Sequence, residues 1–216
     1  MRRAALALAC LGTACREETP PPVFELRAVV APALARLEAE LPPVAASDAG
    51  DAAAAREAFD AILGPLRSGD PDFVALALED AARLPPAAVE LAAQALLDPS
   101  EEPAVRVALA DVLGLCATPR ALEALLDGLE ATDVPALRVQ CAYRLGQAGD
   151  DRVVPRLILR LKYEQDLQTV YWLVDALARF GHLDGLEPLV VVWSRAEGEL
   201  RAHAAARLSE LAAEHG

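Results

Sequence analysis

Few residues of this sequence could do chemistry, and the three histidines do not suggest a metal site. His182 falls in a predicted turn, His203 in the last predicted helix, and His215 next to the C-terminus. A metal site needs three or four converging ligands, and nothing in the sequence supplies them. We therefore expect no metal and no cofactor.

Carboxylates recur at a fixed spacing. Asp111 follows Glu79 by 32 residues, and Asp175 follows Asp111 by twice that interval. Acid–base catalysis needs two carboxylates close together in a pocket. Acids set one repeat apart more often form exposed or inter-repeat ion pairs. We predict that these acids are structural and that the protein has no catalytic residue and is not an enzyme.

Two cysteines, Cys116 and Cys141, fall at positions that other repeats fill with Leu, Ala or Phe, which indicates small apolar core residues. They are predicted on neighbouring helices with an axial offset of about 10 Å at 1.5 Å per residue. A disulfide needs Cα atoms within about 7 Å, so none is expected between them.

A 32-residue repeat must position all these groups. Val105-Arg106 recurs as Leu137-Arg138, Leu113-Gly114 recurs as Leu145-Gly146, and Leu129 recurs as Leu161. A constant period of this size is typical of a solenoid, in which stacked helix pairs share one continuous core. The predicted fold class is therefore all-α, and strands are not expected.

The apolar spacing predicts helices throughout the chain. An irregular start has one helix over 23–41, with Phe24, Val30, Leu34, Leu37 and Leu41 at mostly helical steps, which Pro32 should kink or split. A second helix runs from Asp51 and stops at Gly64-Pro65. The regular pairs that follow are 72–84 with 87–97, 104–115 with 120–131, 135–147 with 152–163, and 167–180 with 186–195, before a final helix over 199–213.

In the repeated Val-Arg and Leu-Gly pairs, each followed by an apolar second helix, the chain resembles HEAT repeats, in particular the short units of phycobilisome lyases. The resemblance covers about 73–214. It implies a right-handed α-solenoid whose second helices line the concave face, and usually a role in binding other proteins. The domains expected are a signal peptide (1–14), a lipidated Cys15 and tether (15–22), irregular helices (23–66), and a HEAT-like array with a capping helix (67–216).

The first residues suggest export. Arg2 and Arg3 precede a short apolar run and Gly12-Thr13-Ala14-Cys15, which resembles a bacterial lipoprotein signal with Cys15 lipidated. Arg16 follows, so we expect the bacterial cell envelope, at the outer membrane facing the periplasm, with the membrane reached through the lipid anchor alone. A plain secretory peptide, or an ordinary helix start in a cytosolic scaffold, remains open.

The formal net charge of −13 argues against nucleic acid as a partner, because the polyanion would repel this surface. An apolar content of 54% with only 4% aromatic residues indicates an aliphatic core. We expect a monomer.

One basic and apolar strip stands out on the predicted second helices of this acidic chain, and we interpret it as a site for a protein or peptide partner. Two alternatives are open: the arginines pair with neighbouring acids, and the valines are covered by the last helix. A different function, an enzyme or accessory subunit like the lyases, acting on a chromophore or modified protein, would require a ligand-sized cavity. The strip consists of Arg156, Leu159, Arg160, Tyr163, Val191, Val192 and Arg195.

Overall fold

The computed structural model describes residues 49–131 and 134–215, and every regular element within them is helical. The predicted signal, Cys15, the tether and the helix over 23–41 lie outside the described residues. The described residues form two compact units, 49–180 and 181–215, which are considered one at a time. The first unit contains α3 (Ala49–Ser68), α4 (Pro71–Ala81), α5 (Pro86–Leu97), α6 (Pro103–Cys116), α7 (Pro119–Ala131), α8 (Pro135–Ala148), η1 (Asp151–Val153), α9 (Val154–Tyr163) and α10 (Leu167–Phe180).

Proline begins several of these helices. Pro71, Pro103 and Pro135 occupy the first turn of α4, α6 and α8, where their fixed φ suits a helix and their missing N–H is not needed. At the other end, Ala117 after α6 and Gly149 after α8 have left-handed φ angles of 48° and 65°. The regular helix pairs therefore begin and end close to their predicted positions.

The predicted end of the second helix at Gly64-Pro65 is wrong, because α3 continues to Ser68. A proline clashes with the Cβ of the residue before it when that residue is helical. Gly64 has no Cβ, which removes this part of the penalty. Beyond the proline, Leu66 is buried, so packing favours the last turn of the helix.

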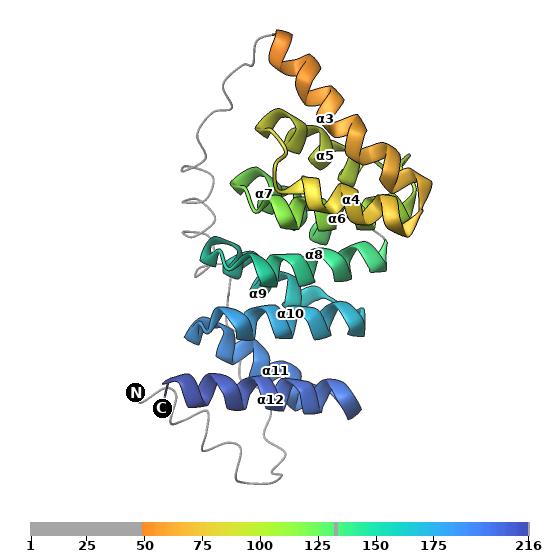
Figure 1. The fold of residues 1–216 in the computed structure, drawn as a ribbon. Coiled ribbons are helices and arrows are strands. Elements are labelled where there is room, and N and C mark those ends of the chain that lie inside the picture. Colours follow the sequence, from red (N-terminus) through yellow and green to blue (C-terminus); the bar gives the residue numbers. More distant parts are fainter. Residues whose placement is uncertain (1–48, 132–133, 216) are drawn as a thin grey trace, which may run out of the picture. The chain divides into compact units, whose positions relative to one another are not determined.

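The helices of the first unit stack in two rows. In one row α4 packs on α6, α6 on α8 and α8 on α10, and α8 and α10 run parallel in Figure 1. The other row is α3, α5, α7 and α9. Each of α3, α5 and α7 contacts the next helix of its own row and the helix that follows it in the chain.

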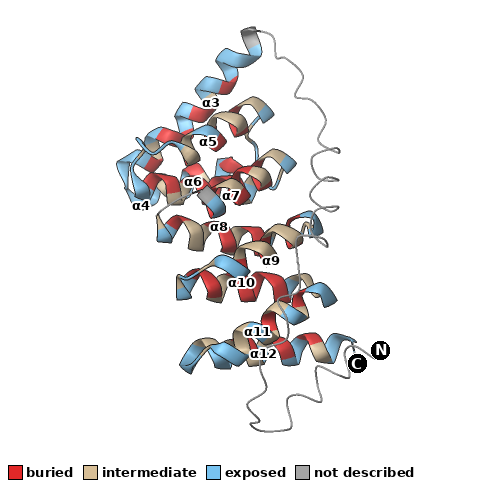
Figure 2. Cartoon of the chain, turned by 180° about the vertical axis from the view of Figure 1, so that it is seen from behind, coloured by how far each residue is buried: buried red, intermediate tan, exposed pale blue. Residues whose placement is uncertain are grey.

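The core lies between the rows, at apolar positions that recur every 32 residues. Leu109, Cys141 and Leu173 are all 0% exposed, as are Leu125 and Leu157 on the second helices. Figure 2 shows buried residues where helices face each other and exposed residues at the turns. Repeating the same apolar positions therefore does create one continuous core, as predicted.

The repeated glycine brings neighbouring first helices close together. A Cβ on Gly146 of α8 would lie 2.7 Å from the Ala176 Cβ of α10, and a Cβ on Gly114 of α6 would lie 2.6 Å from the Arg144 Cδ of α8. No side chain fits at either position without movement of its neighbour. The Leu-Gly pair in the sequence thus marks the place where consecutive first helices touch.

The second unit contains η2 (Leu183–Gly185), α11 (Leu186–Arg195) and α12 (Gly198–His215). Helices α11 and α12 pack on each other, and Leu189 and Ala204 are both 0% exposed. The Arg201 guanidinium lies 5.3 Å from the centre of the Trp193 ring, within cation–π range.

Candidate interaction surface on α9

Helix α9 carries four of the seven predicted partner-binding residues. Its buried side consists of Val154, Leu157 and Leu161, at helical spacing. Arg156, Leu159, Arg160 and Tyr163 therefore lie on other sides of the helix. Their surroundings differ greatly, and this decides what each can offer to a partner.

Arg156 is bound to three acids of the neighbouring helix α7. Its guanidinium donates to Glu123 Oε2 at 2.9 Å, Asp127 Oδ1 at 3.2 Å and Glu130 Oε1 at 2.9 Å, and its side chain is only 14% exposed. Burial acts to lower the pKa of Arg156, but the hydrogen bonds and charges of the three acids, Glu130 first among them, together raise the pKa above its usual value. The positive charge is thus used to join α7 to α9.

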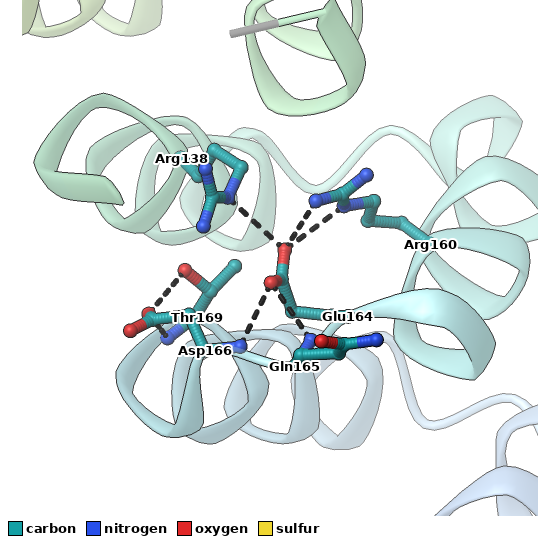
Figure 3. Close-up of polar contacts among 6 residues, drawn as sticks. All are labelled: Arg138, Arg160, Glu164, Gln165, Asp166 and Thr169. Atoms are coloured by element: carbon teal, nitrogen blue, oxygen red, sulfur yellow. Dashed lines mark hydrogen bonds and ion pairs between the residues drawn. The ribbon is translucent and has the colours of Figure 1, made fainter. Parts of the chain in front are cut away.

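Arg160 is bound in the same way to Glu164, in the turn after α9. Glu164 Oε2 accepts from Arg160 Nε at 3.0 Å and from Arg138 Nε of α8 at 3.2 Å. Its other oxygen, Oε1, accepts from the backbone N–H groups of Gln165 and Asp166, both at 2.9 Å. Figure 3 shows this single carboxylate between the two guanidinium groups, above the start of α10.

The Glu164 carboxylate is almost fully buried, with 3% of its side chain exposed. Burial acts to raise the pKa of Glu164, but the hydrogen bonds from the Asp166 backbone and from Arg160 outweigh it and leave the pKa below its usual range. Next to it, Asp166 accepts from the backbone N–H and the hydroxyl of Thr169, both at 2.7 Å, and caps α10. The turn between α9 and α10 is therefore fixed at both ends.

Large apolar side chains next to this fixed turn are exposed. Tyr163 is 64% exposed and Leu167, the first residue of α10, is 70% exposed. The ammonium of Lys162, an exposed residue and the only lysine of the sequence, lies 5.4 Å from the centre of the Tyr163 ring. Leu159 is half-buried, one helical turn before these residues. We call Leu159, Lys162, Tyr163 and Leu167 the α9 surface.

Leu167 was not among the predicted site residues, although the sequence does carry a signal for it. Pro71, Pro103 and Pro135 precede it at intervals of 32 residues, each at a helix start. Leucine replaces proline only at this step of the column. A comparison between the repeats would therefore have revealed Leu167 as a large apolar residue at the start of a helix.

The other three predicted residues lie on α11, in the second unit. Val191 is 40% exposed, Val192 is half-buried and Arg195 is exposed, so α12 does not cover Val191. The structure thus brings four of the predicted residues together on α9 and the remaining three on α11.

The arginine of the repeated Val-Arg and Leu-Arg pairs has a structural role. Arg106 is 6% exposed, and its Nε donates to the Leu96 carbonyl at 2.8 Å, near the end of α5. Carbonyls in the last turn of a helix lack partners within the helix, so this bond satisfies one of them. Arg138, at the equivalent position, binds Glu164.

The groups considered for catalysis are also used in the fold. Asp111 accepts from Arg144 Nε at 2.6 Å and from the Gln140 amide, both on the next first helix, and Asp175 accepts from Arg179 Nε at 2.7 Å. The Asp111–Arg144 pair confirms the predicted inter-repeat ion pair, whereas the pair of the buried Asp175 with Arg179 lies within α10 and is neither exposed nor between repeats.

Both thiols of the described residues are free, and burial makes them unreactive. Burial raises the pKa of Cys116 to about 11 and also raises the pKa of the fully buried Cys141. A thiol with a raised pKa holds little of the thiolate that acts as a nucleophile. Across 49–131 and 134–215 no three His, Cys, Asp or Glu residues are grouped as metal ligands, and no helix is long and apolar enough to cross a membrane.

Stacked helix pairs with a shared core define an all-α solenoid, and comparison with known proteins agrees. Residues 89–170 match the family of HEAT repeats, as the repeated motifs predicted. A chain in the structure of the complex of CpcE and CpcF of phycocyanin lyase from Nostoc sp. PCC7120 is similar, with a TM-score of 0.58 and 16% identity over 70% of this chain and 98% of that chain. No curated protein matches the sequence.

Proposed function

We propose that this HEAT-repeat protein is a non-enzymatic module that binds a protein or peptide partner through the α9 surface. The observation that carries the proposal is the exposure of Tyr163 and Leu167 on a turn fixed by Glu164. Tyrosine and neighbouring apolar groups supply much of the energy of protein interfaces. A fixed turn also reduces the entropy lost on binding, because the surface is already ordered.

The charges define what the partner should offer. Arg156 and Arg160 are each bound to acids of the chain, whereas Lys162, the cation of the α9 surface, is exposed and lies near the Tyr163 ring. We expect a partner segment with an apolar anchor for Tyr163 and Leu167 and a carboxylate near Lys162. Reversing Arg156 or Arg160 would disturb the fold as well as the surface, so these arginines are poor test positions.

The test is affinity capture with the double variant Tyr163→Ser and Leu167→Ser. Mass spectrometry should find a protein that the wild-type chain captures and the double variant loses, with circular dichroism unchanged because both side chains are exposed. Leu115→Ser, at a residue that is 39% exposed on α6, is the matched control and should keep the partner. If the double variant captures the same proteins as the wild type, the α9 surface is not the binding site.

A second candidate function, that of an accessory subunit acting on a chromophore-bearing protein, is suggested by the likeness of fold to a chain of the phycocyanin lyase complex, at 16% identity. Purified phycocyanin, tested for binding and for a change in its absorbance spectrum, separates the two candidates. A spectral change on mixing would favour the accessory role over a simple interaction module.

We further propose that Cys15 is lipidated and anchors the module in the cell envelope, on the strength of the Gly12-Thr13-Ala14-Cys15 sequence. In a bacterial host, the wild-type protein should take up radiolabelled palmitate and sediment with membranes. Cys15→Ser should lose both the label and the sedimentation, whereas Cys116→Ser should keep them. A label that persists in Cys15→Ser would disprove the assignment.

A further inference from the structure

Helix α4 has an open side where the later first helices contact a preceding helix. Leu76 of α4 is 57% exposed, and the equivalent residues of α8 and α10 are Gln140 and Trp172. Gln140 donates to Asp111 of α6, and the Trp172 ring packs edge-on at 5.0 Å from the Tyr143 ring of α8. In both cases the side chain reaches the preceding first helix. The described residues contain no first helix before α4, so Leu76 is left open.

Phe73 lies on the same side of α4, one helical turn before Leu76. It is followed at intervals of 32 residues by three buried residues, Val105, Leu137 and Thr169. Phe73 is 54% exposed, although it is the largest residue of the four. The side of α4 that faces away from α6 therefore presents two large apolar side chains.

Helix α3, next to this side of α4, has the same property. It packs on α4 and α5 as α5 packs on α6 and α7, so it takes the place of a second helix. Ala61 of α3 is exposed, whereas the next three equivalent residues, Ala93, Leu125 and Leu157, are all buried. Figure 2 shows long exposed stretches on α3. The open side of α4 thus continues onto α3.

This open area carries negative charge that the chain does not neutralise. Glu57 of α3 and Asp72 of α4 are exposed, and neither carboxylate forms an ion pair with the residues that the structure describes. The equivalent positions after Glu57 hold buried apolar residues, namely Val89, Ala121 and Val153. An acid where the repeat otherwise has an apolar residue makes this area unlike the core contacts between repeats.

The cations of this region are already used. Residues 49–85 contain seven acids and three arginines, and each arginine is bound to an acid. These pairs are Arg56 with Asp60 at 3.7 Å, Arg67 with Glu101 at 2.6 Å, and Arg83 with Asp80 at 2.9 Å. The positive charge that would complement Glu57 and Asp72 must therefore come from a partner.

We propose that Glu57, Ala61, Asp72, Phe73 and Leu76, which we call the α3–α4 face, bind a basic amphipathic helix of another protein. The helix would take the place of a preceding first helix, with apolar residues at three- and four-residue steps against Phe73 and Leu76 and with Lys or Arg beside the two acids. A second copy of the chain would bring the same acids to the contact. Residues 23–41, with three acids and two arginines, offer no excess of positive charge.

The test is photo-crosslinking in the native cells, with Phe73→benzoylphenylalanine in the full chain. Mass spectrometry should find position 73 linked to a segment of another protein that has apolar residues at helical steps and more Lys and Arg than Asp and Glu. Leu115→benzoylphenylalanine, at an exposed residue of α6, is the matched control and should not link to this segment. A link to a second copy, to residues 23–41 or to an acidic segment overturns the proposal, and so does the absence of any product.

A second measurement tests the charges, with a synthetic peptide of the linked sequence and the purified full chain. Glu57→Lys combined with Asp72→Lys should weaken binding by about tenfold or more in fluorescence anisotropy, with circular dichroism unchanged because both acids are exposed. Glu187→Lys combined with Glu199→Lys changes the net charge equally at exposed residues of the second unit and should keep the affinity. Equal affinities of the two double variants would overturn the proposal.

The α3–α4 face is separate from the α9 surface, and the two can be tested apart. Tyr163→Ser combined with Leu167→Ser should bind the peptide as the wild type does. This proposal can therefore fail while the proposed function stands. Loss of peptide binding in that variant would place the peptide on the α9 surface and overturn the assignment to the α3–α4 face.

Discussion

At the scale of single residues, Glu164 joins several elements. One carboxylate accepts from α8, from α9 and from two backbone N–H groups just before α10. A buried carboxylate is stable as an anion only when donors surround it, and here four donor groups do so. If the acid is removed, the two guanidinium groups keep their burial but lose the charge of Glu164.

Glu164→Gln should therefore lower the free energy of unfolding by about 2–3 kcal/mol, because it takes the Glu164 anion away from the partly buried Arg138 and Arg160. Urea unfolding followed by circular dichroism measures the loss. Gln165→Ala is the matched control, since the Gln165 side chain is exposed and its backbone N–H is kept. An equal stability of both variants would mean that the cluster contributes nothing to the fold.

Residue types alone could not have revealed this cluster. The sequence drew attention to Arg156 and Arg160 as basic residues, and their pairing with nearby acids was only one of two interpretations. Their partners depend on how α7 packs on α9 and on the path of the turn after α9. The exposure of Tyr163, by contrast, agrees with its predicted place on the strip, because helical periodicity alone separates it from Leu157 and Leu161.

At the scale of elements, the helices were predictable because apolar periodicity, proline starts and the 32-residue repeat all agree. The wrong boundary at Gly64-Pro65 arose where a strong local stop signal is outweighed by burial of Leu66, and the helix predicted over 72–84 ends three residues early, at Ala81. Local signals mark helix ends reliably only when the residues beyond them have nothing to pack against. Ala117 and Gly149 follow the ends of α6 and α8 at equivalent positions of two repeats. Substitutions there test directly how much the local backbone conformation contributes to stability.

Ala117→Gly and Gly149→Ala should have opposite effects on stability. Ala117 has φ 48° and Gly149 has φ 65°, a region in which a Cβ is unfavourable. The glycine variant should gain about 0.5–1 kcal/mol and the alanine variant should lose a similar amount. No atom lies within 4 Å of a Cβ added at Gly149, so backbone conformation alone determines that loss. Thermal unfolding gives the change in melting temperature for each variant. Changes of the same sign in the two variants would contradict the prediction.

At the scale of the whole molecule, inter-repeat ion pairs should make stability depend on pH. Arg120 lowers the pKa of Glu90, Arg67 lowers the pKa of Glu101, and the donors around Glu164 lower its pKa. A carboxyl with a lower pKa in the folded state binds protons more readily when unfolded. These groups therefore contribute stability that is fully present above the unfolded pKa of about 4.3 and is lost as the pH falls through the lower folded values.

Melting temperatures should be nearly constant from about pH 7 to 5 and fall steeply below about pH 4. Glu164→Gln should melt lower at neutral pH and show a smaller fall in acid, because one of the protonating groups is gone. The measurement compares the melting temperature as a function of pH for the wild type and for Glu164→Gln. Parallel curves would mean that Glu164 does not contribute to the acid transition.

The Arg156 bridge has a mechanical consequence. Helices α8 and α10 touch through Gly146, with no room between them, whereas α7 and α9 approach less closely and are joined by one long side chain and its three acids. The contact between α8 and α10 should thus resist bending more than the contact between α7 and α9. Bending at this point would stretch the α7–α9 contact, and dissolved ions that screen the Arg156 bridge would make it easier.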